Sequence, residues 1–201
     1  MIIRQPSINT LRSGVKCLLT CGLLAGSSMS MADSQTTWFG EVADGEWLAG
    51  IKLGAVAPDI PGYDTAPMAT LVFGYQFSRP VGDRGSASIE LELGTSDDAN
   101  ITSSGFNGSG EYDIHTAGLF FNYRSPGTVY FKGKMGILDS NIDSRFDSGA
   151  DLKSNDAAFA LGLGFGVRLG ENGRTTLEAE WMSASGDNDI NYYNLGANIA
   201  F

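Results

Sequence analysis

Pairs of like charges two residues apart are the side chains of this chain best placed to act together. The pairs are Glu90 with Glu92, Lys132 with Lys134, and Glu178 with Glu180. Residues two apart in an extended strand point to the same face, so each pair would present two equal charges to one side. Because buried charges have to be paired, the spacing predicts a network of ion pairs between the acidic and basic pairs.

Two further bases complete this predicted network. Lys52 and Arg168 fall on the same face of their own segments as the charged pairs do. Four acids would therefore face four bases, with no net charge. Gln76, Asn122 and Asn198 are the expected neutral neighbours. The alternative is that all of these are scattered polar groups on the wet face of a soluble sheet. Like-charged pairs that alternate in sign on every second strand favour the network.

The elements that must hold these residues are β-strands. Apolar residues alternate with other residues along eight segments, whose apolar members span 47–57, 69–77, 87–93, 117–123, 129–137, 159–169, 177–181 and 193–201. This period of two is typical of strands, and strands of about ten residues span a bilayer when tilted. After Ala32 no apolar stretch reaches the ~18 residues that a membrane helix requires. The pattern predicts an all-β fold, an eight-stranded antiparallel up-and-down transmembrane β-barrel.

The expected connections between these strands alternate in length. The long links are residues 58–66, 96–111, 140–155 and 184–189, and the short turns are residues 78–85, 124–127 and 170–173. Long loops at one end and short turns at the other are typical of outer-membrane barrels. Both chain ends would then lie at the short-turn, periplasmic end.

The second face of the strands decides between a soluble barrel with an apolar interior and a membrane barrel with an apolar exterior. Over residues 158–168 this face carries Ala158, Ala160, Gly162, Gly164, Gly166 and Arg168. A surface in contact with water would carry many long charged side chains, whereas small residues fit the lumen of a narrow barrel. We therefore expect the glycine-rich face, with its charged pairs, to point inward.

The composition and the first residues indicate export. The chain has 201 residues, which suits one domain. A basic region, a short apolar run and a small-residue cleavage site predict a signal peptide over residues 1–32. Residues 33–45 would be a short periplasmic segment and residues 46–201 the barrel. Both cysteines and three positive charges lie in the signal, so its removal changes the net charge from −10 to −13, which disfavours nucleic-acid binding.

The last residues carry a resemblance to a known family. Asn194 and Gly196 alternate with apolar residues, and the chain ends on Ile199 and Phe201 in the same alternation. This ending resembles the C-terminal signal by which the assembly machinery recognises bacterial outer-membrane barrels. Residues 33–201 look like the small eight-stranded barrels of the OmpA transmembrane-domain and OmpX/Ail type. The resemblance implies a Gram-negative outer-membrane location, contact with lipid and lipopolysaccharide, and a structural or adhesive role in which acidic loops meet a host or surface ligand.

Two other functions of small barrels are alternatives. The first is a narrow channel, which removal of the lumen ion pairs would open. The second is a lipid A enzyme similar to PagP or PagL. The single histidine, His115, lies near the loop end of its strand, but Ala117 stands where PagL-like enzymes carry the serine of His-x-Ser. A PagP-like hydrocarbon pocket would also clash with a charged lumen, so we expect a structural histidine and no enzyme activity.

Acidic residues in the predicted loops invite comparison with cation sites. Four aspartates recur at every fourth position: Asp139, Asp143, Asp147 and Asp151. The segment that begins with Asp187 and Asp189 is similar to the opening of a calcium loop, but it lacks the glycine and the distant glutamate of an EF-hand. A solvated polar loop is therefore favoured, and we assign no metal and no cofactor. Asp187 and Asp189 remain candidates for a cation that bridges to lipopolysaccharide.

Overall fold

The computed structural model describes residues 45–77, 85–102, 108–170, 173–186 and 189–201. The predicted signal peptide, residues 1–32, and all of the segment 33–45 except Gly45 lie outside this description. The described residues form nine strands: β1 (Glu46–Pro58), β2 (Ala66–Gln76), β3 (Ser86–Ser96), β4 (Ala99–Ile101), β5 (Gly110–Arg124), β6 (Val129–Phe146), β7 (Asp151–Leu169), β8 (Thr175–Ser185) and β9 (Ile190–Ala200). Within these ranges no helix is long and apolar enough to cross a membrane.

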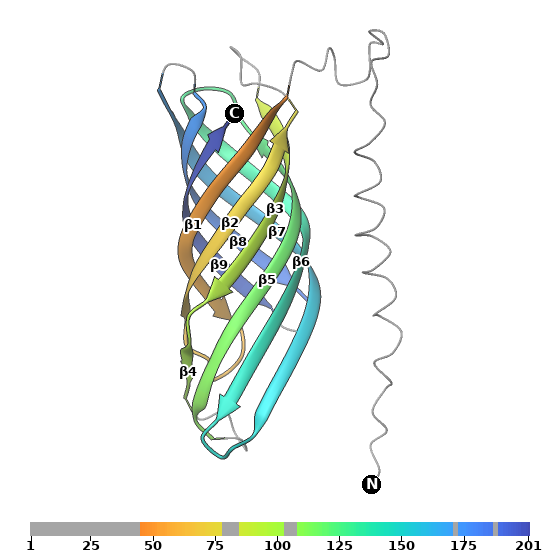
Figure 1. Ribbon diagram of the computed structural model, residues 1–201, viewed down its shortest axis with the longest axis vertical. Coiled ribbons are helices and arrows are strands. Elements are labelled where there is room, and N and C mark those ends of the chain that lie inside the picture. The colour runs from red at the N-terminus through yellow and green to blue at the C-terminus, as the bar shows by residue number, and fades with distance from the viewer. Residues whose placement is uncertain (1–44, 78–84, 103–107, 171–172, 187–188) are drawn as a thin grey trace. The chain divides into compact units, whose positions relative to one another are not determined.

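The strands close into one antiparallel barrel (Figure 1). Apart from β3 and β4, each strand pairs with the next one along the chain, and β9 pairs with β1 from Leu48 to Pro58 to complete the circle. Both β3 and β4 pair with β5, β4 beyond the end of β3, so the nine strands act as eight. The predicted all-β, eight-stranded antiparallel barrel is confirmed. We call the end that holds the chain's last residue the turn end and the opposite end the loop end.

Small residues on the inward face let the barrel be narrow. In β7, Phe159, Leu161 and Leu163 are more than half exposed, whereas Ala160 between them is fully buried. At Gly136 in β6, a Cβ atom would overlap the backbone carbonyl oxygen of Leu119. Only glycine fits there, because the two strands approach each other closely. The alternation of large outward and small inward residues therefore sets the diameter of the lumen.

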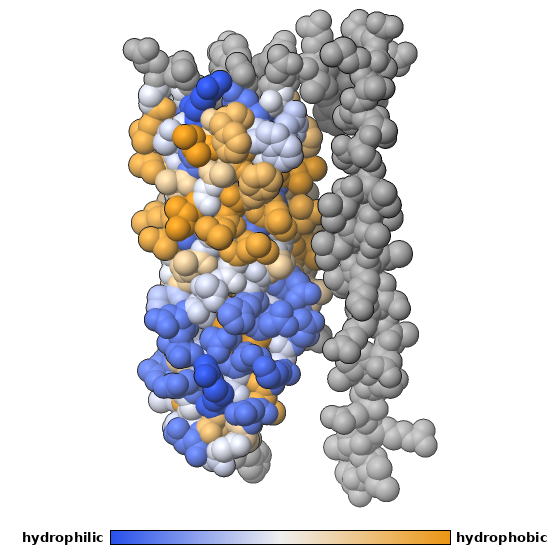
Figure 2. Space-filling view, in the orientation of Figure 1, coloured by the Kyte–Doolittle hydropathy of each residue, from blue (hydrophilic) through white to orange (hydrophobic). Residues whose placement is uncertain are grey.

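The polarity of the wall reverses along the barrel axis. Toward the turn end the outer surface is apolar, and we call this zone the apolar belt; toward the loop end the outer surface is hydrophilic (Figure 2). The lumen shows the opposite order. At the loop end it is filled by a cluster of buried apolar side chains that includes Met68, Tyr112, Ile114, Leu138, Ile142 and Phe146. The loop-end part thus has an apolar interior and a polar exterior, as a β-structure in water has. The belt has a polar interior and an apolar exterior.

The strands are longer than the sequence pattern predicts. The expected 140–155 link is mostly strand, because β6 runs to Phe146 and β7 begins at Asp151. The expected 96–111 link likewise contains β4 and the start of β5. Apolar residues occupy the outward face of the strands only within the belt. Beyond the belt the apolar residues point inward, so the outward-face pattern does not predict the rest of each strand.

Candidate functional site

Seven of the eight charged residues that the sequence singles out meet in the lumen, at the height of the apolar belt. They come from β1, β3, β6 and β8, and each is less than one tenth exposed: Lys52, Glu90, Glu92, Lys132, Lys134, Glu178 and Glu180. Their strands place them there because each is flanked in sequence by outward-facing belt residues, as Lys52 is by Ile51 and Leu53. Arg124 of β5, 2% exposed, joins them.

Four of these side chains form a closed ring nearer the loop end, which we call the loop-side ring. The amine of Lys52 lies 2.7 Å from Glu92 and 2.9 Å from Glu180. The amine of Lys134 lies 2.7 Å from Glu92 and 3.0 Å from Glu180. Each base therefore touches both acids and each acid touches both bases. The ring carries no net charge.

The other four form a second ring nearer the turn end, the turn-side ring. The guanidinium of Arg124 lies 2.8 Å from Glu90 and 2.6 Å from Glu178. The amine of Lys132 lies 2.8 Å from Glu178 and 3.7 Å from Glu90. Lys132 also lies 2.8 Å from Glu180 of the loop-side ring, so the two rings are joined. Buried charges cost free energy unless they are paired and hydrogen-bonded, and this arrangement pairs all eight.

Neutral groups add hydrogen bonds to the rings. The hydroxyl of Ser88 donates to Glu90 over 2.7 Å, and the hydroxyl of Tyr130 donates to Glu178 over 2.8 Å. Asn198 donates to Glu178 over 3.1 Å, as expected for a neutral neighbour. The other two expected neighbours, Gln76 and Asn122, are buried in the lumen. On the loop side the amine of Lys134 lies 3.9 Å from the centre of the Phe120 ring, where the charged zone meets the apolar cluster.

Arg168 differs from its predicted role. Its guanidinium donates to the backbone carbonyl oxygens of Gly127 and Ser125, the latter over 3.1 Å, and stacks 4.2 Å from the centre of the Tyr130 ring. It therefore fastens the β5–β6 turn at the turn end. The fourth base of the network is Arg124, which the sequence pattern places in the turn 124–127. The sequence pattern could have identified Arg124, because it follows Asn122 by two residues on the same inward face.

The final residues lie on both faces of β9. Asn194 is buried and points into the lumen with Gly196, whereas Ile199 and Phe201 are exposed on the belt. The N–H of Phe201 donates to the carbonyl oxygen of Trp47 over 2.9 Å, and the N–H of Trp47 donates to Phe201 over 3.1 Å. The last residue of the chain therefore extends the β9–β1 pairing that closes the barrel.

Of the two cation candidates, only Asp189 lies in the described part of the chain. Asp187 lies outside the described residues. Asp189 is exposed, and its backbone carbonyl oxygen accepts a hydrogen bond from the N–H of Asp59 over 2.8 Å. Within the described ranges, no three His, Cys, Asp or Glu side chains come together as metal ligands would.

His115 lies on the outer surface just beyond the apolar belt. Its Nδ1 is 3.0 Å from the Thr95 hydroxyl of β3, and its Nε2 is 3.2 Å from the Asp113 carboxylate. The contacts run from a hydroxyl through a base to an acid, which is the composition of a nucleophilic site. The His115 side chain is, however, 58% exposed, so water reaches the group freely. Sequence inspection missed Thr95 because it lies on the neighbouring strand.

Polar groups also hold the loop end together. The hydroxyl of Tyr112 donates to the backbone carbonyl oxygen of Asp64, which ties β5 to the β1–β2 link. Burial, with a smaller contribution from the Asp64 carboxylate, raises the pKa of Tyr112 to about 12. On the outer face the amine of Lys153 lies 2.8 Å from Asp143, and this hydrogen bond raises the pKa of Lys153.

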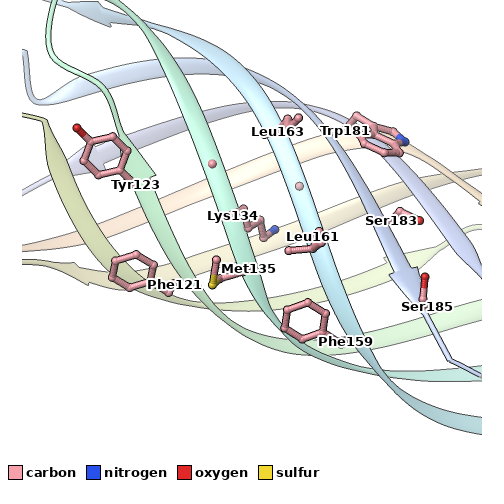
Figure 3. A pocket seen from close by; sticks show the side chains of 12 residues that line it. Phe121, Tyr123, Lys134, Met135, Phe159, Leu161, Leu163, Trp181, Ser183 and Ser185 are labelled. Carbon is pink, nitrogen blue, oxygen red and sulfur yellow. The ribbon is translucent and has the colours of Figure 1, made fainter.

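The outer wall carries a shallow groove of about 520 Å³ across β5 to β8 (Figure 3). Its described lining is mainly apolar and includes Phe121, Met135, Leu161 and Trp181, with Ser183 and Ser185 as polar members. Gly133 leaves it open, since a Cβ atom there would have no neighbour within 4 Å. No histidine, aspartate or glutamate is among the described residues that line the groove, and the amine of its Lys134 is paired with Glu92 and Glu180 in the lumen. The groove therefore belongs to the apolar belt.

Comparisons with known proteins agree with this architecture. The model of the family described as outer membrane protein beta-barrel domain matches residues 18–201. A search of curated proteins found no significant match.

Neisserial surface protein A is similar with a TM-score of 0.52 and 9% identity, over 78% of this chain and 97% of its own. The attachment invasion locus protein Ail of Yersinia pestis has a TM-score of 0.49 and 16% identity, with the same two coverages. The outer membrane enzyme PagL has a TM-score of 0.45 and 15% identity, over 76% of this chain and 98% of its own. Identities this low show a shared fold alone.

Proposed function

The chain belongs to the outer membrane protein beta-barrel domain family, and we propose that it is a non-enzymatic, non-conducting barrel that presents its loop end to partners outside the cell. The reversal of polarity along the wall carries this proposal. An outward apolar surface that surrounds salt-bridged charges fits a wall in hydrocarbon, where every polar group has to be satisfied internally. The hydrophilic zone beyond it fits water. Because the short β5–β6 and β7–β8 connections lie at the turn end, we assign that end to the periplasm and the loop end to the outside of the cell.

Two kinds of filling support a lumen closed to ions. At the belt, the two rings join five strands across the lumen through contacts of 2.6–3.0 Å such as Arg124–Glu178 and Lys134–Glu180. Above them the buried apolar cluster around Tyr112, Ile142 and Phe146 fills the same lumen. An ion would have to break the rings and then pass apolar side chains. We therefore favour the closed barrel over the narrow channel.

The extracellular part supplies the working surface in this proposal. Its own apolar core keeps the extended strands rigid without lipid, and its outer face carries Asp98, Asp113, Asp143 and Asp151. Rigid strands lose less conformational entropy than free loops when a partner binds. An acidic rigid surface suits a surface-interaction role toward basic partners, and it would meet lipopolysaccharide phosphates only through bridging cations.

Export and assembly complete the proposal. Residues 1–32 would direct the chain across the inner membrane as a signal peptide. Asn194, Gly196, Ile199 and Phe201 would then be recognised by the barrel-assembly machinery. In support, the backbone of Phe201 pairs with Trp47, so the final residue takes part in closing the barrel.

The closed lumen can be tested in planar lipid bilayers. We expect the wild-type protein to produce no stable openings, because the rings and the apolar cluster block the lumen at two heights. Folding of the same preparation is checked by heat-modifiable mobility on gels, and a porin inserted under the same conditions serves as the positive control. Stable unitary openings of the folded wild-type protein would contradict the proposal and favour the channel.

The non-enzymatic role has a separate test at His115. We expect expression of the wild-type protein or of His115→Ala to leave the acylation pattern of lipid A unchanged in mass spectra. The physical reason is that the His115 side chain is 58% exposed, and the hollow of about 330 Å³ beside it is lined by polar residues such as Asn141 and Lys153, so it would not desolvate a nucleophile. Loss or gain of an acyl chain with the wild type, abolished by His115→Ala, would instead identify a lipid A enzyme.

A further inference from the structure

The link between β1 and β2 lies at the loop end of the barrel (Figure 1). Its two ends belong to neighbouring strands, but the hydroxyl of Tyr63 in its middle lies 3.0 Å from the hydroxyl of Ser144 on β6. Because β3 and β4 act as one strand, β6 stands directly opposite β1 in the order of the barrel. Residues 59–65 therefore cross the outer mouth of the lumen, and we call them the strap.

Main-chain hydrogen bonds fasten the strap to β4. The N–H of Asp64 donates to β4 over 3.0 Å, and the N–H of Thr102, just after β4, donates back to the strap over 2.6 Å. Between these two bonds, Tyr63 and Ile101 form an isolated antiparallel bridge. The hydroxyl of Tyr112 on β5 also donates to the backbone carbonyl oxygen of Asp64. The strap is thus bound to β4, β5 and β6, none of which it connects in sequence.

The strap has an apolar inner face and a polar outer face. Ile60 and Tyr63 pack against the buried apolar cluster of the loop end. The centre of the Tyr63 ring lies 4.8 Å from the centre of the Tyr112 ring. On the other side Asp59 and Asp64 are exposed. Apolar side chains turned inward and acids turned outward show that the strap covers the cluster and separates it from water.

The strap is attached more weakly than the strands that it joins. β1 pairs with β2 from Glu46 to Val56 and with β9 from Leu48 to Pro58. Among the described residues, the strap forms one isolated bridge. Local opening takes place where ladder bonds and buried apolar contacts are few. In addition, Gly62 has a φ of 88°, a conformation that residues with a Cβ atom rarely adopt.

We propose that the strap opens and closes the outer mouth of the lumen as a unit, while the barrel below it stays closed. In the closed form, partners outside the cell meet the acidic face with Asp59 and Asp64. In the open form they meet Tyr63 together with apolar residues of the cluster such as Ile101 and Phe146. The inference rests on the proposed function in placing the loop end outside the cell, and it adds a regulation of the surface that partners meet there.

Thiol labelling can follow the opening of the strap. Both cysteines of the chain lie in the predicted signal peptide, so one introduced cysteine is the single thiol of the mature protein. Ile142→Cys reports on the cluster, because Ile142 is 5% exposed and lies two residues from Ser144 on the same face of β6. Ser86→Cys is the matched reporter away from the strap, since Ser86 is 1% exposed in the lumen at the turn end. The probe is a water-soluble maleimide.

Four changes in the strap are compared in the Ile142→Cys background, with mature protein purified from outer membranes and folding checked by heat-modifiable mobility. Tyr63→Ala removes the packed ring and the hydroxyl, and should speed labelling about tenfold or more. Tyr63→Phe keeps the ring and should speed labelling a few-fold. Gly62→Val places a β-branched residue at positive φ and should act like Tyr63→Ala. Gly62→Asn is its control, because asparagine tolerates this region, and should stay within about threefold of the unchanged strap.

Three results would overturn the proposal. The first is equal labelling of Ile142→Cys with and without Tyr63→Ala, or equal labelling with Gly62→Val and Gly62→Asn. The second is an equal acceleration at Ser86→Cys, because the whole barrel would then open and not the strap alone. The third is labelling of Ile142→Cys at the rate of the urea-unfolded chain when the strap is unchanged, because the mouth would then never be closed.

These results are separable from the proposed function. The strap variants leave the rings and the belt intact, so the outer-membrane location and the silent bilayer recordings should not change. Failure of the labelling experiment would remove the opening of the strap only. Openings of the wild-type protein in bilayers would remove the closed-barrel proposal and leave the labelling result standing.

Discussion

Replacing Lys132 and Lys134 together by glutamate is expected to prevent the chain from folding into a barrel. The two lysines contact three of the four acids at 3.0 Å or less, and both are almost fully buried. The double change turns four acids and four bases into six acids against Lys52 and Arg124. Breaking one buried pair costs about 3–5 kcal/mol because it leaves a charge uncompensated. That cost approaches the whole stability of a typical domain, about 5–15 kcal/mol.

Folding of this variant can be followed by heat-modifiable mobility and tryptophan fluorescence after dilution from urea into detergent micelles. Lys153→Glu is the matched control, because this lysine is exposed and a surface pair contributes at most about 1 kcal/mol. Adding Glu178→Lys and Glu180→Lys to the double variant restores four acids and four bases, and should recover part of the folded fraction. Normal folding of the glutamate double variant would show that the rings do not stabilise the barrel.

Arg124→Met is expected to destabilise the barrel far more than Arg168→Met. Arg124 contacts Glu90 and Glu178, so its loss should lower the free energy of unfolding by about 3–5 kcal/mol. Arg168 binds two backbone carbonyl oxygens and stacks on Tyr130, and its loss should lower the free energy of unfolding by about 1–2 kcal/mol. Methionine keeps much of the apolar stem in both cases, so the comparison isolates the guanidinium.

The measurement is a urea titration of each variant folded in micelles, with the wild type as reference. Both variants lose one positive charge, so a difference between them reports location and not net charge. A larger effect of Arg168→Met would contradict the structure and favour Arg168 as the fourth lumen base, as the sequence predicts.

The sequence by itself determined which way each residue of the belt faces. An extended strand has a side-chain period of two, so large apolar residues such as Leu161 and Leu163 had to share one face and the intervening small residues the other. The same rule put Glu90 with Glu92 and Lys132 with Lys134 on the inward face. The strand number of the barrel followed from local alternation, and its inside-out polarity followed from the small residues on the second face of the strands. Pairing of acids with bases could be anticipated because unpaired buried charge is so costly.

Only the tertiary structure decided which base contacts which acid and where each strand ends. The height of a residue in the lumen depends on strand register and stagger, which is why Arg124 and not Arg168 reaches Glu178. The extended strands were hidden because apolar residues such as Ile142 and Phe146 turn inward once the wall leaves the belt, which inverts the pattern. Neighbouring strands also differ in length, β7 with 19 residues and β8 with 11. Such differences arise from the three-dimensional pairing of distant segments, and no local period records them.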